Sequence, residues 1–158
     1  MKIKKYGGSE MDECAMRHKL VYRLDEVPEV AQTLHNLLGH CAVMTFSGSL
    51  GAGKTTLIRE LLHYAGVQDE VIQSPTFNYV SIYTSPSGWR FYHFDLYRIK
   101  SLQDFNQAGF ADYLYEPQSY ALIEWPEIIM PILTERVCHI DIDYINEDSR
   151  CLVYGCVK

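Results

Sequence analysis

The sequence contains no long apolar run, no closely paired cysteines and no excess of basic side chains, and each absence excludes a class of protein. No apolar stretch approaches the roughly 18 residues that cross a bilayer, so we expect no membrane partner. The five cysteines form no C-x-x-C pair, which argues against a zinc or redox motif and for reduced thiols in a cytoplasmic protein. The net charge of −6, from 14 basic and 20 acidic side chains, argues against a domain that grips DNA or RNA by itself.

The length of the chain and its hydrophobic patterning both indicate a single domain. A chain of 158 residues suits a single domain, and no internal repeat or low-complexity tract divides it. Residues 1–19 are polar and poorly patterned. We therefore expect a loose lead-in before a domain that spans residues 20–158.

Hydrophobic periodicity predicts helices and buried strands, with hairpins around them. The predicted elements are helices over about 26–38 and 54–66, strands at 20–24, 41–46, 71–73 and 120–123, and hairpins that pair 78–84 with 89–95 and 136–145 with 150–157. Continuous apolar runs indicate strands buried on both faces, whereas alternating segments joined by turn sequences indicate hairpins. We predict an α/β fold: a mixed sheet with a parallel βα core in the first half of the chain and antiparallel hairpins around it.

A glycine-rich turn before the second helix satisfies the pattern G-x-x-x-x-G-K-[ST] at every fixed position. The glycines let the backbone aim successive N–H groups at phosphate oxygens, and the helix start adds the positive end of its dipole. Lys54 supplies a cation for the β- and γ-phosphates, and the Thr55 hydroxyl can ligate Mg²⁺. The domain is thus predicted to be of P-loop NTPase type, with nucleotide-binding residues Gly48, Ser49, Leu50, Gly51, Ala52, Gly53, Lys54, Thr55 and Thr56.

Two carboxylates at strand ends are candidate partners of this loop, because open α/β sheets bind ligands at the carboxyl ends of their strands. Glu124 ends the apolar run 120–123, as a Walker-B acid would, and Asp95 ends the second arm of the first hairpin. Either carboxylate can hold Mg²⁺ or orient an attacking water. Thr76, in a turn after the strand at 71–73, is either a sensor of the γ-phosphate or simply a turn residue, as threonine usually is in a Ser-Pro-Thr turn.

Three neighbours of these acids admit both a packing and a binding interpretation. His93 shares one strand face with Asp95 by period two, and we expect it to be a packed core residue. Arg98 either neutralises phosphate charge or pairs with a surface acid. Trp125 follows Glu124 directly, at a rim where aromatic side chains usually pack.

Missing motifs narrow the class of nucleotide-binding protein. No D-x-x-G follows the loop and no N-K-x-D occurs, so adenine is favoured over guanine. The arginines are scattered and form no arginine-rich lid, which argues against a small-metabolite kinase without excluding it. A nucleotide-gated interaction module without meaningful hydrolysis is the other alternative, and the sequence separates it poorly from an ATPase.

Four blocks of sequence resemble the TsaE (YjeE) family of small bacterial P-loop ATPases: GSLGAGKTT at 48–56, SPTF at 74–77, HFDLYR at 93–98 and EWPE at 124–127. The resemblance covers roughly residues 20–150. It departs from the family at Ser49, where an acidic or amide residue is frequent. Residues 1–19 also exceed the usual start of the family.

The resemblance implies a weak ATPase, with ATP/ADP and Mg²⁺ as its ligands, that is required for N6-threonylcarbamoyladenosine at position 37 of tRNA. It implies the TsaB–TsaD pair as partner, with tRNA contacted only indirectly through the complex. The catalytic residues that it implies are Lys54, Thr76, Asp95 and Glu124. The metal ligands that it implies are Thr55, Asp95 and Glu124, with Trp125 beside the nucleotide.

Overall fold

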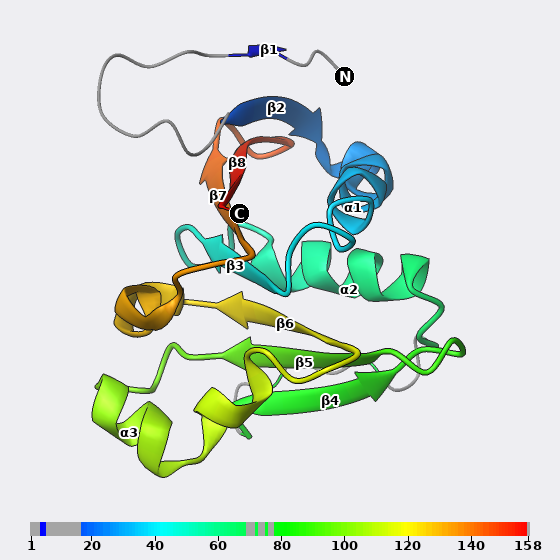
Figure 1. Ribbon diagram of the computed structural model, residues 1–158. Coiled ribbons are helices and arrows are strands. Elements are labelled where there is room, and N and C mark those ends of the chain that lie inside the picture. Colours follow the sequence, from blue (N-terminus) through cyan, green and yellow to red (C-terminus); the bar gives the residue numbers. More distant parts are fainter. Residues whose placement is uncertain (1–3, 6–16, 69–71, 73–74, 76–77, 158) are drawn as a thin grey trace.

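A single mixed sheet organises the protein, whose computed structural model describes residues 4–5, 17–68, 72, 75 and 78–157. The strand order is β1-β2-β8-β7-β3-β6-β5-β4 (Figure 1). The strands are β1 Lys4–Lys5, β2 His18–Arg23, β3 Val43–Ser47, β4 Val80–Thr84, β5 Arg90–Asp95, β6 Ser119–Glu124, β7 Val137–Tyr144 and β8 Ser149–Val157. The helices are α1 Val27–His35, α2 Lys54–Tyr64 and α3 Leu102–Gln107, with short 3-10 turns η1 Leu24–Glu26, η3 Phe110–Tyr113, η4 Pro126–Ile128 and η5 Met130–Ile132.

Parallel pairing is confined to the centre of the sheet, where β7, β3, β6 and β5 run in one direction. Both predicted hairpins are confirmed, β4 with β5 and β7 with β8, and each gives one arm to the parallel core. The mixed α/β sheet is therefore as predicted. The expectation that the parallel units lie in the first half of the chain is wrong, because β2 pairs antiparallel with β8 and three of the four parallel strands come later.

The two faces of the sheet carry separate hydrophobic cores. Helices α1 and α2 cover one face, and α3 with the turns η3, η4 and η5 covers the other (Figure 1). Neighbouring residues of β6 alternate between them, since Leu122 packs in the first core whereas Ala121 and Ile123 pack in the second. Burial on both faces explains the run of adjacent apolar residues in this strand, Tyr120 to Ile123.

Some expectations differ from the structure at element ends or fall outside its description. The first helix ends at His35, three residues earlier than the periodicity predicts, and is preceded by the turn η1. The strand expected at 71–73 lies outside the described residues except for Ile72, which is not in a strand. Most of the predicted lead-in 1–19 also lies outside them, so its separation from a domain spanning 20–158 stays a prediction. In the part of the chain that is described, no helix has the length and apolar character needed to span a membrane.

Candidate functional site

The glycine-rich loop links the carboxyl end of β3 to the first turn of α2, as the sequence predicts. Gly48 has a φ of 138°, and a Cβ there would collide with the carbonyl oxygen of Ile142. Gly51 has a φ of 79°, and a Cβ there would lie 2.8 Å from the Tyr144 hydroxyl. Glycine is thus required at both positions by backbone conformation and by close approach. The unpaired N–H groups of the first turn of α2 add an anion-binding helix start.

A cavity of about 330 Å³ lies beside this loop and collects most of the predicted site. It includes nine residues predicted to act on nucleotide or metal, together with Tyr97 and Arg98 from the segment after β5. Its lining residues are Leu50, Gly51, Gly53, Lys54, Thr55, Thr56, Asp95, Tyr97, Arg98, Glu124 and Trp125. A second cavity, of about 380 Å³, contains Trp89 and Tyr120 and shares no residue with the loop.

The Lys54 ammonium is folded against the loop. Its Nζ donates to the carbonyl oxygens of Gly48 at 2.8 Å and Ser49 at 3.0 Å, and lies 3.8 Å from the centre of the Trp125 ring. Burial lowers the pKa of Lys54, and the negative charge of Glu124 is the largest of several that oppose this change. Only 4% of the residue is exposed, so the cation is held within the site by carbonyl groups and an aromatic face.

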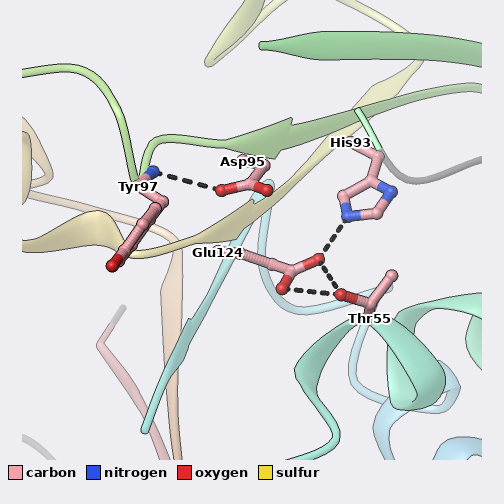
Figure 2. Close-up of polar contacts among 5 residues, drawn as sticks. All are labelled: Thr55, His93, Asp95, Tyr97 and Glu124. Carbon is pink, nitrogen blue, oxygen red and sulfur yellow. Dashed lines mark hydrogen bonds and ion pairs between the residues drawn. The ribbon is translucent and has the colours of Figure 1, made fainter. Parts of the chain in front are cut away.

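Glu124 is joined to the loop by Thr55. The Thr55 hydroxyl lies 2.8 Å from Oε1 and 2.9 Å from Oε2 of the Glu124 carboxylate (Figure 2). Glu124 ends β6, the parallel neighbour of the strand that leads into the loop, and is 3% exposed. The rule that ligand-binding side chains meet at the carboxyl ends of parallel strands therefore correctly places this acid.

His93 is buried, as expected, but it also contacts Glu124. Its Nε2 lies 2.8 Å from Glu124 Oε1, and an ionised carboxylate can only accept, so Nε2 is the donor in that state (Figure 2). The other ring nitrogen, Nδ1, is buried without a hydrogen-bond partner among the described residues. Sequence reasoning missed this contact, although the period-two face that His93 shares with Asp95 was a signal for it.

Asp95 lies at the rim of the same cavity. It is paired in register with Glu124 across β5 and β6, and its Oδ1 accepts a hydrogen bond from the Tyr97 N–H at 3.1 Å (Figure 2). The Tyr97 ring packs against the Trp125 ring with centroids 4.9 Å apart. Trp125 adopts a left-handed backbone conformation, with φ and ψ both 57°, which is uncommon for a bulky residue. The Trp125 side chain thus has both roles that the sequence left open, since it packs against Tyr97 and also lines the cavity.

The chemistry of the donor set suits Mg²⁺. Thr55, Asp95 and Glu124 offer one hydroxyl and two carboxylates, and Mg²⁺ takes oxygen ligands but only one or two protein carboxylates, since substrate phosphates and waters complete its shell. No cage of three or more His, Cys, Asp or Glu side chains occurs in the described ranges. The small number of protein oxygen ligands and the lack of a side-chain cage are both consistent with a Mg²⁺ site that is completed by the phosphates of a bound ligand.

Three of the predicted residues that the structure describes do not line the cavity, and a fourth falls outside the description. Thr76 lies outside the described residues, so its predicted sensor role stays a prediction. Gly48, Ser49 and Ala52 take part through backbone carbonyls, the first two as acceptors from Lys54 and Ala52 as an acceptor from Arg150. Arg150 was not predicted as a site residue.

Comparison with known proteins identifies the TsaE family. A family model described as "Threonylcarbamoyl adenosine biosynthesis protein TsaE" matches residues 10–152. Among relatives named tRNA threonylcarbamoyladenosine biosynthesis protein TsaE, that of Rickettsia felis is 35% identical over 127 residues, which are 80% of this chain and 72% of the relative. That of Haemophilus influenzae is 40% identical over 118 residues, or 74% and 73% of the two chains. A crystal structure of Bacillus subtilis YdiB, 24% identical, shares the fold with a TM-score of 0.66 over 95% of this chain and 90% of that one.

Proposed function

Because this chain belongs to the TsaE family, we propose that it is a Mg²⁺-dependent ATP-binding and ATP-hydrolysing subunit required for N6-threonylcarbamoyladenosine at position 37 of tRNA. The observation that carries the proposal is the contact between Thr55, at the start of α2, and Glu124, at the end of β6, inside a cavity that also contains Lys54 and Asp95. A phosphate-binding loop joined to a buried acid is the arrangement that nucleotide hydrolysis needs.

The loop residues bind the phosphates of the nucleotide in this proposal. Backbone N–H groups at the start of α2 donate to phosphate oxygens, and the dipole of the helix favours their negative charge. The Lys54 ammonium already lies at the loop and exchanges part of its carbonyl contacts for the β- and γ-phosphates. The Trp125 ring, which packs on Lys54, lies where it can cover one side of the bound nucleotide.

The acidic residues complete the metal site and the site of attack. When bound, Mg²⁺ would neutralise charge that develops on the phosphate oxygens. Thr55, Asp95 and Glu124 are the residues that would hold it. A carboxylate not used in this way can orient the water that attacks the γ-phosphorus, and His93 fixes the orientation of the Glu124 carboxylate for either role.

The proposed partner is the TsaB–TsaD pair. The relatives are named for tRNA threonylcarbamoyladenosine biosynthesis, and a chain with a net charge of −6 is poorly suited to bind tRNA alone. We therefore place tRNA on the partner proteins, with this chain contacting it only through the complex. Thr76 is proposed to report the state of the γ-phosphate to a surface that the partner binds.

The experiment is steady-state phosphate release from ATP and Mg²⁺, by the full chain alone and with added TsaB–TsaD pair. Lys54→Ala and Glu124→Ala test the site, and Glu29→Ala, at an exposed position on α1, is the matched control. We expect a slow basal rate that rises with the pair, and loss of release in both site variants but not in the control. Circular dichroism shows whether each variant is folded.

Each alternative predicts a different result. Tight ATP binding without phosphate release, alone or with the pair, would make the chain a nucleotide-gated interaction module. Formation of ADP together with a phosphorylated compound instead of free phosphate would make it a small-metabolite kinase. Folded Lys54→Ala and Glu124→Ala proteins with normal turnover would overturn the assignment of the site.

A further inference from the structure

A buried arginine contacts the phosphate loop from the β7–β8 hairpin. Arg150 is the second residue of β8, is only 7% exposed and does not line the cavity. Its Nε donates to the carbonyl oxygen of Ala52 at 3.2 Å. Its Nη1 lies within hydrogen-bond distance of three carbonyl oxygens in its own turn, those of Asn146 at 2.9 Å, Glu147 at 3.2 Å and Ser149 at 3.0 Å. One guanidinium thus ties the hairpin turn to the loop.

Among the described residues, the groups that contact this arginine are backbone carbonyls and an aromatic ring. The centre of its guanidinium lies 4.0 Å from the centre of the Tyr144 ring. Within the described part of the chain it forms no ion pair with a carboxylate. A buried cation without a paired acid is costly unless something else uses its charge. The loop, which Arg150 contacts at Ala52, is a feature of the fold suited to an anion.

The hairpin approaches the loop at three points, of which Arg150 is the last. Gly48 lies so close to the Ile142 carbonyl that no side chain fits between them, and Gly51 lies similarly close to the Tyr144 hydroxyl. The contact of Arg150 with Ala52 continues this row. The β7–β8 hairpin therefore supports the loop along most of its length.

The Ala52 contact also sets the direction of the next N–H group. No cis peptide bond is present among the described residues, and in a trans peptide the C=O and the following N–H point in opposite directions. Because the Ala52 carbonyl points to Arg150, the N–H of Gly53 points the other way, and Gly53 lines the cavity. A cation on the carbonyl side also polarises the peptide and strengthens its N–H as a donor.

We infer that Arg150 is a positioning residue for nucleotide binding, which orients the peptide between Ala52 and Gly53 toward the phosphates of a nucleoside di- or triphosphate. This inference rests on the proposed function of the same site. Arginine is needed because Nε and Nη1 serve the loop and the turn at the same time, in one plane. A lysine in its place carries the same charge on one nitrogen, so it cannot present two separate nitrogens in one plane to the loop and the turn.

The test compares Arg150→Met and Arg150→Lys with the unaltered full chain. Arg59→Met, which removes an exposed arginine from α2, is the matched control. ADP affinity is measured by titration calorimetry with Mg²⁺, well below the unfolding temperature of each variant, and kcat and KM for ATP are measured in parallel. We expect Arg150→Met to raise the Kd for ADP and the KM for ATP by about tenfold or more, with kcat at saturating ATP within roughly threefold of the unaltered value.

A purely structural role would lower the unfolding temperature and leave the affinity of the folded protein unchanged. Unaltered ADP affinity in folded Arg150→Met would therefore overturn the inference while the proposed function stands. If Arg150→Met does not fold, Arg150→Lys decides: a rise in Kd of about threefold to tenfold supports the inference, and unaltered affinity overturns it. Absence of ADP binding by the unaltered chain would overturn the proposed function and this inference together.

Discussion

The Thr55 hydroxyl lies almost equally far from both carboxylate oxygens of Glu124, at 2.8 and 2.9 Å, although the two residues are 69 positions apart in the chain. A hydroxyl carries one proton, so one carboxylate oxygen is enough to keep this contact. Glu124 can therefore retain Thr55 while its second oxygen turns to another partner. This freedom distinguishes Glu124 from an acid that is fully occupied by a fixed ion pair.

Glu124→Gln removes a negative charge and keeps the size of the side chain. We expect nucleotide binding to persist and phosphate release to fall by roughly 100-fold or more, because the charge acts in the reaction more than in binding. Phosphate release and ADP calorimetry check this prediction side by side. Glu135→Gln, at an exposed position, is the control. Equal turnover of Glu124→Gln and the unaltered chain would contradict it.

Asp95→Asn tests which acid contributes to Mg²⁺ binding. Asp95 lies at the rim and is more exposed than Glu124, at 9% against 3%. If Asp95 helps to hold the ion, its amide variant needs about tenfold more Mg²⁺ for half-maximal phosphate release, with little change in the rate at saturating Mg²⁺. A Mg²⁺ titration at fixed ATP gives the answer, with Asp112→Asn as an exposed control. An unchanged Mg²⁺ requirement would remove Asp95 from the metal site.

His93→Leu tests the contact between His93 and Glu124. The substitution removes the donor to Glu124 Oε1 from a fully buried position, whereas His93→Gln retains a donor. We expect turnover to fall by about tenfold in His93→Leu and by less in His93→Gln, with ADP affinity nearly constant in both. His40→Leu is the control at an exposed histidine. Loss of ADP affinity in parallel with turnover would instead indicate a role in packing alone.

The raised pKa of Tyr22 predicts that the free energy of unfolding falls as the pH becomes alkaline. Burial raises its pKa from 10.0 to about 12, opposed by the charge of Arg150. The folded protein therefore keeps a proton that the unfolded chain releases, so this stabilisation is complete below pH 10 and is lost as the pH rises through 12. The loss amounts to about 3 kcal/mol for this residue.

Urea unfolding between pH 9 and pH 12, about the range in which tyrosines titrate, measures this effect. We expect the free energy of unfolding of Tyr22→Phe to fall less steeply across the range than that of the unaltered protein. Tyr64→Phe, on the exposed side of α2, is the control and should follow the unaltered protein. Parallel curves for Tyr22→Phe and the unaltered chain would contradict the prediction.

Local patterns predicted the elements and the loop, because each depends on neighbouring residues. The glycines, Lys54 and Thr55 all lie within residues 48–55. Each hairpin consists of two segments of alternating apolar and polar residues that a short turn sequence joins. The position of Glu124 next to Thr55 also followed from a general rule on parallel strands. The sequence pattern did not predict the order of the strands in the sheet. β3 lies between β6 and β7, which come more than 70 residues later in the chain, so local periodicity carries no information on this pairing.

The contacts of His93 and Arg150 were missed for a related reason. His93 lies on a strand face that borders both the hydrophobic core and the cavity. Periodicity alone therefore cannot tell a histidine that packs in the core from one that contacts a site residue. Arg150 did leave a signal: it begins the row Arg150, Leu152 and Tyr154, whose side chains are all buried on one face of β8. An arginine in an apolar row needs acceptors, but only the folded chain shows that one of them is Ala52.

The packing of Lys54 on Trp125 gives the protein an intrinsic optical signal. Tryptophan emission responds to charges and to solvent near the indole, and Trp125 lies in the cavity with an ammonium 3.8 Å from its ring centre. The chain has only two tryptophans, and the other, Trp89, stacks on Tyr120 at the second cavity. In a Trp89→Phe background, a single emitter would follow every arrival and departure of nucleotide in real time, without a label.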